Sequence, residues 1–262
     1  MDENKVKKIV NGSGFPLQIG IQSLIEDSYK EHGWRVLFSE HSWINHDTEE
    51  GGFIDLLLLD NSQKIILNIE CKRVKDGKWY FLQSEPRLKN RRHAKCHYLL
   101  AKSGKPEFWG WRDVTLEPSC PEAEFCVIAG EDARASRSML EKIAAGVVHS
   151  TEGFAIEDHS YSHEIEKFER SYFNVIVTTA DLYVCNFDAR VVDIDNGEID
   201  ETNTTEVPFV RFRKQLSTYA TPSFSWKGGS SYEISRIKEN TVFVVSSKHL
   251  VRFLKEFELD GS

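Results

Sequence analysis

The 262-residue sequence contains no long hydrophobic run and no low-complexity segment or internal repeat. No apolar stretch approaches the roughly 20 residues that are needed to span a membrane. The first residues are not followed by the hydrophobic segment of a secretory signal peptide. We therefore expect a cytoplasmic protein that is not embedded in a membrane.

Cysteine is scarce, and its spacing excludes two kinds of site. The five cysteines are odd in number and include no Cys-x-x-Cys pair, which predicts reduced thiols and neither a disulfide framework nor a zinc site. The sequence also lacks a P-loop, a dinucleotide-binding glycine fingerprint and a Ser/His/Asp set. Its chemistry must come from another group of residues.

Positive charge is in deficit overall but concentrated in one region. The net charge of -8 argues against a protein whose whole surface binds nucleic acid. Between Lys64 and Arg112, however, thirteen lysines and arginines stand against four acidic residues, whereas the rest of the chain has twenty against thirty-seven. A local basic zone suits a phosphate-bearing substrate. The acidic remainder suits either a protein partner or solubility alone.

The most informative stretch is residues 53–72, FIDLLLLDNSQKIILNIECK. Two apolar runs flank a polar cluster at residues 60–64, which predicts two strands joined by a turn. Asp55, Glu70 and Lys72 lie within the apolar runs. Burying these charges costs several kcal/mol unless they are paired or bound to a metal.

The expected register brings these charges together. If residues 60–63 form the turn, Leu59 pairs with Lys64 and Asp55 lies opposite Asn68. The two-residue alternation of a strand then places Glu70 and Lys72 on the same face as Asp55. A slip of one residue would move Asp55 to the other face, so the prediction depends on the turn.

Two neighbouring carboxylates with a lysine are typical of a magnesium site that acts on phosphate esters. Few oxygen ligands, supplemented by water and substrate phosphate, suit Mg²⁺ better than Zn²⁺, and Mn²⁺ can substitute. A lysine beside such an ion can position the water that attacks a phosphodiester. The alternative is a simple ion pair between Lys72 and Glu70 or Asp55 at a strand end.

These residues resemble the signature of the PD-(D/E)xK nuclease superfamily, in which Asp55 would be followed by Glu70-Cys71-Lys72. Residues 14–18, GFPLQ, resemble the start of the first core helix of that family. Many relatives have a glutamate where Gln18 stands, and Ile54 occupies the place of the proline that precedes the first acid. The resemblance covers residues 12–83.

The resemblance implies specific roles for individual residues. Asp55, Glu70 and the main-chain carbonyl of Cys71 would hold Mg²⁺, and Lys72 would act on the water. Gln18 and Gln83 are the further residues that the resemblance places at the catalytic site.

The basic zone supplies candidates for contact with nucleic acid. Arg73 directly follows the motif, and residues 87–97 form the densest basic stretch, which we interpret as a helix carrying Arg91, Arg92 and Lys95. These side chains would hold phosphates. A solvated basic face explains them equally well.

We therefore expect an α/β fold with a restriction-endonuclease-like core, in which helices flank a mixed central sheet, and a β-rich C-terminal elaboration. The expected organisation is a mobile N-terminus at 1–11, a nuclease-like core at 12–165 and an α+β extension at 166–262. Residues 34–38 are expected as the first strand, with a loop from 41 to 52, and residues 106–121 as another loop.

The expected function is a Mg²⁺-dependent endonuclease acting on nucleic acid, DNA more than RNA. Superfamily members act in restriction, repair and defence against phage, and no residue selects among these settings. The alternative is a catalytically silent nuclease-fold subunit that serves as a binding or assembly module. A protein partner or a homodimer is compatible with either function.

Overall fold

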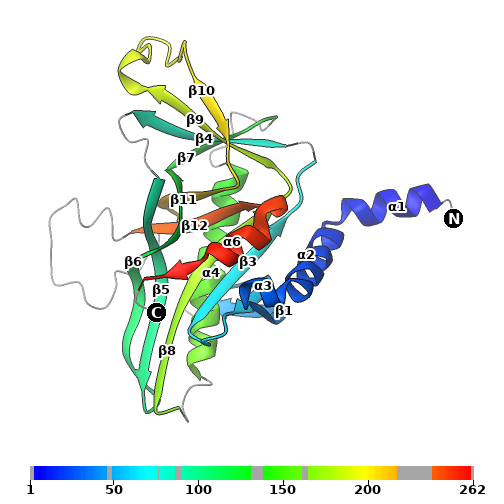
Figure 1. Cartoon of the computed structure of the whole chain (residues 1–262), viewed down its shortest axis with the longest axis vertical. Helices are drawn as coiled ribbons and strands as arrows, with labels where there is room; N and C mark the ends of the chain where they lie inside the picture. The colour runs from blue at the N-terminus through cyan, green and yellow to red at the C-terminus, as the bar shows by residue number, and fades with distance from the viewer. Residues whose placement is uncertain are drawn as a thin grey trace.

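The computed structural model describes residues 3–45, 49–75, 77–85, 90–130, 138–160, 165–216 and 238–260. The fold is α/β, with two mixed sheets and few helices (Figure 1). Within these ranges, no helix combines the length and the apolar character needed to cross a membrane. The α/β class expected from the sequence is thus confirmed.

The chain begins with three helices, α1 (Glu3–Gly12), α2 (Phe15–Asp27) and α3 (Tyr29–His32). Gly14, with φ of 85°, allows the sharp bend before α2, and Pro16 fits the first turn, where no backbone N–H is required. Gly33 ends α3 in the left-handed conformation that favours glycine. Most of the segment expected to be mobile therefore lies in helix α1.

The larger sheet contains nine strands. They are β1 (Arg35–Asn45), β2 (Glu50–Leu59), β3 (Ile65–Lys72), β5 (Asn90–Lys102), β6 (Lys105–Ala123), β8 (Lys167–Thr178), β11 (Phe209–Gln215), β12 (Glu239–Ser246) and β13 (Glu258–Leu259). The order is β1-β2-β3-β8-β12-β11-β6-β13, and β5 pairs with both β6 and β8. Strands β5, β6, β11, β12 and β8 consequently close into a five-stranded barrel.

Both halves of the chain build this sheet. Strands β3, β8 and β12 are parallel neighbours, so Lys72, Thr178 and Ser246 lie side by side at their carboxyl ends. Two of these strands come from the segment expected to be a C-terminal extension. The candidate site at the end of β3 is therefore framed by residues far apart in the sequence.

Three expected elements were wrong. Residues 41–52 are not one loop, because β1 continues to Asn45 and β2 begins at Glu50. Residues 106–121 are not a loop but belong to β6, which forms a long hairpin with β5. The basic stretch at 87–97 is not a helix, because its described part from Asn90 onward is strand β5; residues 86–89 lie outside the described ranges. In β5, residues 94–99 are all buried, so both faces are packed and no alternation marks the strand.

The smaller sheet has the order β10-β9-β4-β7. Its strands are β4 (Lys78–Glu85), β7 (Phe125–Ile128), β9 (Asp181–Asp188) and β10 (Asn203–Glu206). One face of this sheet packs, through Trp79 and Phe81, into the same apolar cluster as α4 (Met139–Ser160) and strand β12. Two 3-10 turns, η1 (Ala189–Val191) and η2 (Ser247–His249), and helix α6 (Leu250–Glu256) complete the fold.

A buried chain of polar side chains joins α4 to the larger sheet. Asn68 of β3 donates to the hydroxyls of Ser150 and Thr151, both at 2.8 Å. Thr151 donates to Asn174 Oδ1 at 2.7 Å, and Asn174 Nδ2 donates to the carbonyl of Thr241 at 3.0 Å. Because buried polar groups are costly to leave unpaired, this chain specifies how α4 sits on the sheet.

The Asn174→Ala variant should lower the free energy of unfolding by about 3 kcal/mol, because it removes the buried acceptor of the Thr151 O–H and the side-chain donor to the Thr241 carbonyl. Urea denaturation of both proteins would measure the difference. Asn203→Ala, at an exposed strand position, is the matched control and should stay within about 0.5 kcal/mol of wild type. Equal stabilities for the two variants would contradict this account.

Candidate metal and catalytic site

The hairpin that carries the motif has a longer turn than expected. Leu59 pairs with Ile66 and not with Lys64, so the predicted register was wrong by two residues. The cause is the carboxylate of Asp60, which accepts hydrogen bonds from the backbone N–H groups of Lys64 and Ile65 at 2.9 and 2.8 Å. This side-chain cap stabilises a wider turn than a four-residue loop.

A shift of two residues preserves the face of every side chain, so the consequence drawn from the register survives. The paired residues end at Leu56 and Ile69, and the same register continued by one residue would set Asp55 opposite Glu70. The charge of Asp55 does reach Glu70, whose pKa it raises.

Asp55 is anchored by the backbone of the neighbouring strand. Its Oδ2 accepts a hydrogen bond from the N–H of Cys71 at 2.7 Å. Burial raises the pKa of Asp55, and the Cys71 N–H and the charge of Lys72 oppose that rise. The Cys71 side chain packs against the apolar cluster that contains Leu67 and Ile69, and burial raises the pKa of its thiol. Cys71 is thus poorly suited to act as a thiolate, and its main chain is what meets the site.

Glu70 has the most perturbed carboxylate of the site. Burial is the main cause and the charge of Asp55 the second, and together they raise the pKa of Glu70 to about 7. The charge of Lys72 acts in the opposite direction on both carboxylates. Two half-buried acids with one nearby ammonium are the arrangement that the motif predicted.

Gln18 of α2 reaches this site. Its Nε2 donates to Glu40 Oε1 at 2.6 Å and to the main-chain oxygen of Asp55 at 3.2 Å. Gln18 is buried, and both bonds fix the amide between the helix and the hairpin. The placement of Gln18 beside Asp55 agrees with its expected position.

Sequence reasoning missed Glu40. This residue follows a register shift in β1, has a φ of 50°, and its charge raises the pKa of both Asp55 and Glu70. The expected strand ended at Phe38, but β1 continues to Asn45, so Glu40 lies next to Asp55 on the paired strand. Glu40 is brought to the site by the pairing of β1 with β2, and no feature of the sequence indicated that pairing.

The basic residues divide into two groups. Arg73 is exposed and directly follows Lys72 at the end of β3. Arg91 and Arg92 lie at the start of β5, a strand that pairs with β6 and β8 and does not carry the motif.

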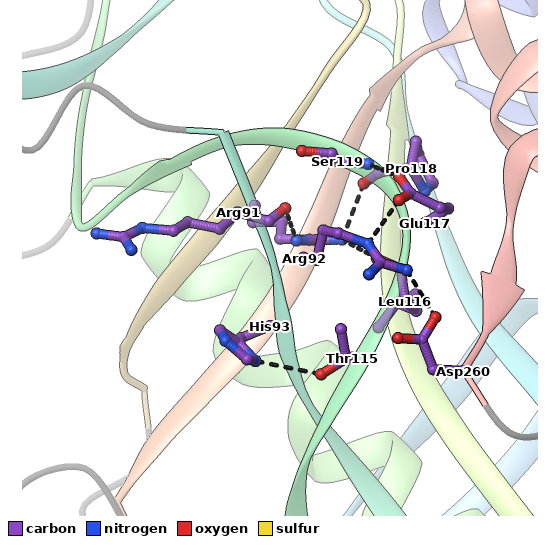
Figure 2. A network of polar contacts seen from close by, with 10 residues as sticks. Arg91, Arg92, His93, Thr115, Leu116, Glu117, Pro118, Ser119 and Asp260 are labelled. Carbon is purple, nitrogen blue, oxygen red and sulfur yellow. Dashed lines mark hydrogen bonds and ion pairs between the residues drawn. The ribbon is translucent and has the colours of Figure 1, made fainter.

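Figure 2 shows how the second group is held. Arg92 pairs with Glu117 at 2.5 Å and with Asp260 at 2.6 Å, whereas the Arg91 side chain extends away from this network. Lys95 is only 4% exposed, and its Nζ lies 3.9 Å from Asp113 Oδ2. In this conformation Arg92 and Lys95 are engaged within the protein, and Arg91 is the member of the group that is presented outward.

Gln83 does not lie at the site. It belongs to β4 in the smaller sheet, is buried, and donates from Nε2 to the main-chain oxygen of Glu122 at 2.7 Å. Its geometry links β4 to β6. The residues that the structure brings together are Asp55, Glu70, Lys72, Cys71 and Gln18, with Glu40 added.

The donor set fits Mg²⁺ better than an ion that requires a closed protein cage. Within the described ranges, no cluster of three or more His, Cys, Asp or Glu side chains is arranged to hold a metal. Mg²⁺ is commonly bound by one or two carboxylates and completes its shell with water and phosphate oxygens. Asp55 and Glu70, whose mutual repulsion a divalent cation would relieve, provide such a pair.

Comparisons with protein-family models, with curated proteins and with solved structures find no match to this chain. The argument for its function therefore depends on the motif residues and on their geometry.

Proposed function

We propose that this protein is a Mg²⁺-dependent nuclease, with a PD-(D/E)xK type of site on a restriction-endonuclease-like core made by α2, α4 and the strands around β3. The observation that carries the proposal is the electrostatic interaction among Asp55, Glu70 and Lys72, which lie just beyond the paired residues of β2 and β3. A structural ion pair needs one acid for one lysine. Here three acids, Asp55, Glu70 and Glu40, lie near one lysine, and their mutual repulsion destabilises the folded protein. A destabilising cluster of this kind favours a functional role over a structural one.

Each residue has a role that its position supports. Asp55 and Glu70 would hold the metal, and the Cys71 N–H orients the Asp55 carboxylate for this task. The bound Mg²⁺ would stabilise charge on the phosphate and lower the pKa of water. Lys72 would position the attacking water and offset negative charge in the transition state. Gln18 would hold Glu40 and the Asp55 backbone in place.

The reaction is the hydrolysis of a phosphodiester. A water oxygen forms a bond to phosphorus, the opposite P–O ester bond breaks, and the proton released by the water ends on the leaving oxygen or on solvent. Arg73, exposed directly after the motif, would contact a neighbouring phosphate. Arg91, exposed at the start of β5, would contact another part of the same strand or duplex.

The direct test is cleavage of single- and double-stranded DNA and RNA by the purified protein with Mg²⁺ or Mn²⁺. We expect cleavage of DNA in preference to RNA, and its loss when EDTA removes the metal. A substrate cut equally well in EDTA would contradict the proposed chemistry.

Metal binding can be measured without activity. Mg²⁺ or Mn²⁺ should raise the melting temperature of the wild-type protein, because a ligand that binds only the folded state stabilises it. The Asp55→Asn variant should not respond. Wild-type protein that neither cleaves nor responds to metal would favour the alternative function of a silent binding or assembly subunit.

A further inference from the structure

Helix α1 extends away from the rest of the protein, and none of its residues is buried (Figure 1). Val6, Ile9 and Val10 follow the i, i+3, i+4 spacing of a single helical face, and Ile9 is 62% exposed. A helix of ten residues is marginal in water without tertiary contacts. Its apolar face therefore calls for a covering surface that the described part of the chain does not supply.

A second exposed apolar surface lies on the hairpin of β1 and β2. Phe53, 66% exposed, pairs with Ser42, and the alternation of β1 places Ile44 on the same face. Phe15 and Ile19 add exposed apolar surface at the start of α2. Of the fourteen large apolar side chains exposed in the described ranges, nine belong to the first 53 residues. Unpartnered apolar surface is thus concentrated in the N-terminal part of the chain.

The charges of the two surfaces are complementary. At about 100° per residue, Lys5 and Lys7 flank the apolar face of α1 on its two sides and Lys8 lies on the opposite side; all three are exposed. At the tip of the hairpin, Glu49 and Glu50 are exposed, and Glu50 also contacts His149. In a pair of molecules, the basic amphipathic helix of one copy can pack its apolar face on the hairpin of the other. Its lysines can then attract the glutamates of that hairpin.

We propose that the surface formed by α1 and the β1–β2 hairpin is a dimer interface, in which the α1 helix of each copy packs on the hairpin of the other. A two-fold arrangement buries both apolar surfaces twice and aligns lysines with glutamates in both directions. An anionic lipid surface or a nucleic acid would meet the lysines but would also face Glu49 and Glu50. Strand β1 is also the edge of the larger sheet, and the dimer would cover it.

The test combines sedimentation equilibrium with hydrogen exchange on the full chain and does not depend on nuclease activity. We expect a monomer–dimer equilibrium, in which α1 and the β1–β2 hairpin gain protection together as the concentration rises. The Ile9→Glu variant should weaken association at least tenfold, because a charge would be buried twice in the interface. Asn11→Glu adds the same charge on the polar face of α1 and should leave association within a few-fold of wild type.

Three results would overturn the proposal. One is a protein that remains monomeric at the highest concentration it tolerates. Another is a dimer that Ile9→Glu does not weaken, or that forms without protection of α1. The third is a monomer whose α1 becomes protected only on vesicles containing phosphatidylserine, which would assign the helix to a lipid surface. Circular dichroism of both variants would verify that the rest of the fold is intact.

Discussion

The Lys72→Ala variant is expected to cleave DNA at least about a hundredfold more slowly than wild type, the scale of loss when one group that stabilises transition-state charge is removed. Lys72 lies beside two carboxylates whose pKa values its charge lowers, so its removal also makes both acids harder to ionise. A single-turnover assay with saturating Mg²⁺ would measure the effect on the chemical step.

Lys64→Ala is the matched control for this experiment. Lys64 lies at the other end of β3, is exposed, and belongs to the same hairpin. Its replacement should leave cleavage within a few-fold of wild type. If both variants lose activity equally, the loss comes from the hairpin fold and not from the ammonium group of Lys72. If neither loses activity, Lys72 has no catalytic role.

The Glu70→Gln variant is expected to be more stable than wild type at pH 8 in the absence of metal, by up to about 3 kcal/mol. The folded protein raises the pKa of Glu70 from 4.5 to about 7. Between these values the folded state retains a proton that the unfolded state has released, so the free energy of unfolding falls as the pH rises. Above pH 7 the full cost of the buried charge is present. A neutral glutamine removes that cost.

Urea denaturation of the two proteins at pH 5 and pH 8 would test this result. The difference should be small at pH 5 and large at pH 8, and Mg²⁺ should narrow it at pH 8 by binding wild type alone. Glu107→Gln, at an exposed position of β6, should show no such pH dependence. A Glu70→Gln variant that is destabilised at pH 8 would show that the carboxylate makes a net favourable contact. A Glu70→Gln variant that is more stable but inactive would indicate that the carboxylate is retained for activity although it lowers the stability of the fold.

The hairpin shows how far local chemistry in the sequence can predict geometry. Alternation along two strands placed Asp55, Glu70 and Lys72 on one face, and this prediction tolerated a register error because the error was even. The turn itself was wrong, because a side-chain cap by Asp60 widened it. The start of α2 and the end of α3 also followed from local signals, namely Gly14, Pro16 and Gly33.

Signals that depend on partners far along the chain were misread. The basic stretch that suggested a helix is part of β5, because it pairs with β6 and β8 and is packed on both faces. The same pairing buries Lys95 against Asp113, and Arg92 joins Glu117 and Asp260 (Figure 2). Gln83 was expected at the site because it follows the motif closely in sequence, but its strand belongs to the other sheet.

The sequence by itself determined the charged motif, the strands that carry it and the helix that supplies Gln18, because each depends on contacts between residues near one another in the chain. Only the tertiary structure decided that Glu40 joins the site, that β8 and β12 frame it, and that Lys95 and Gln83 lie elsewhere. The physical reason is that strand pairing brings together backbone groups separated by many residues. Any extended segment can make those hydrogen bonds, so the packing of the whole chain selects the partner.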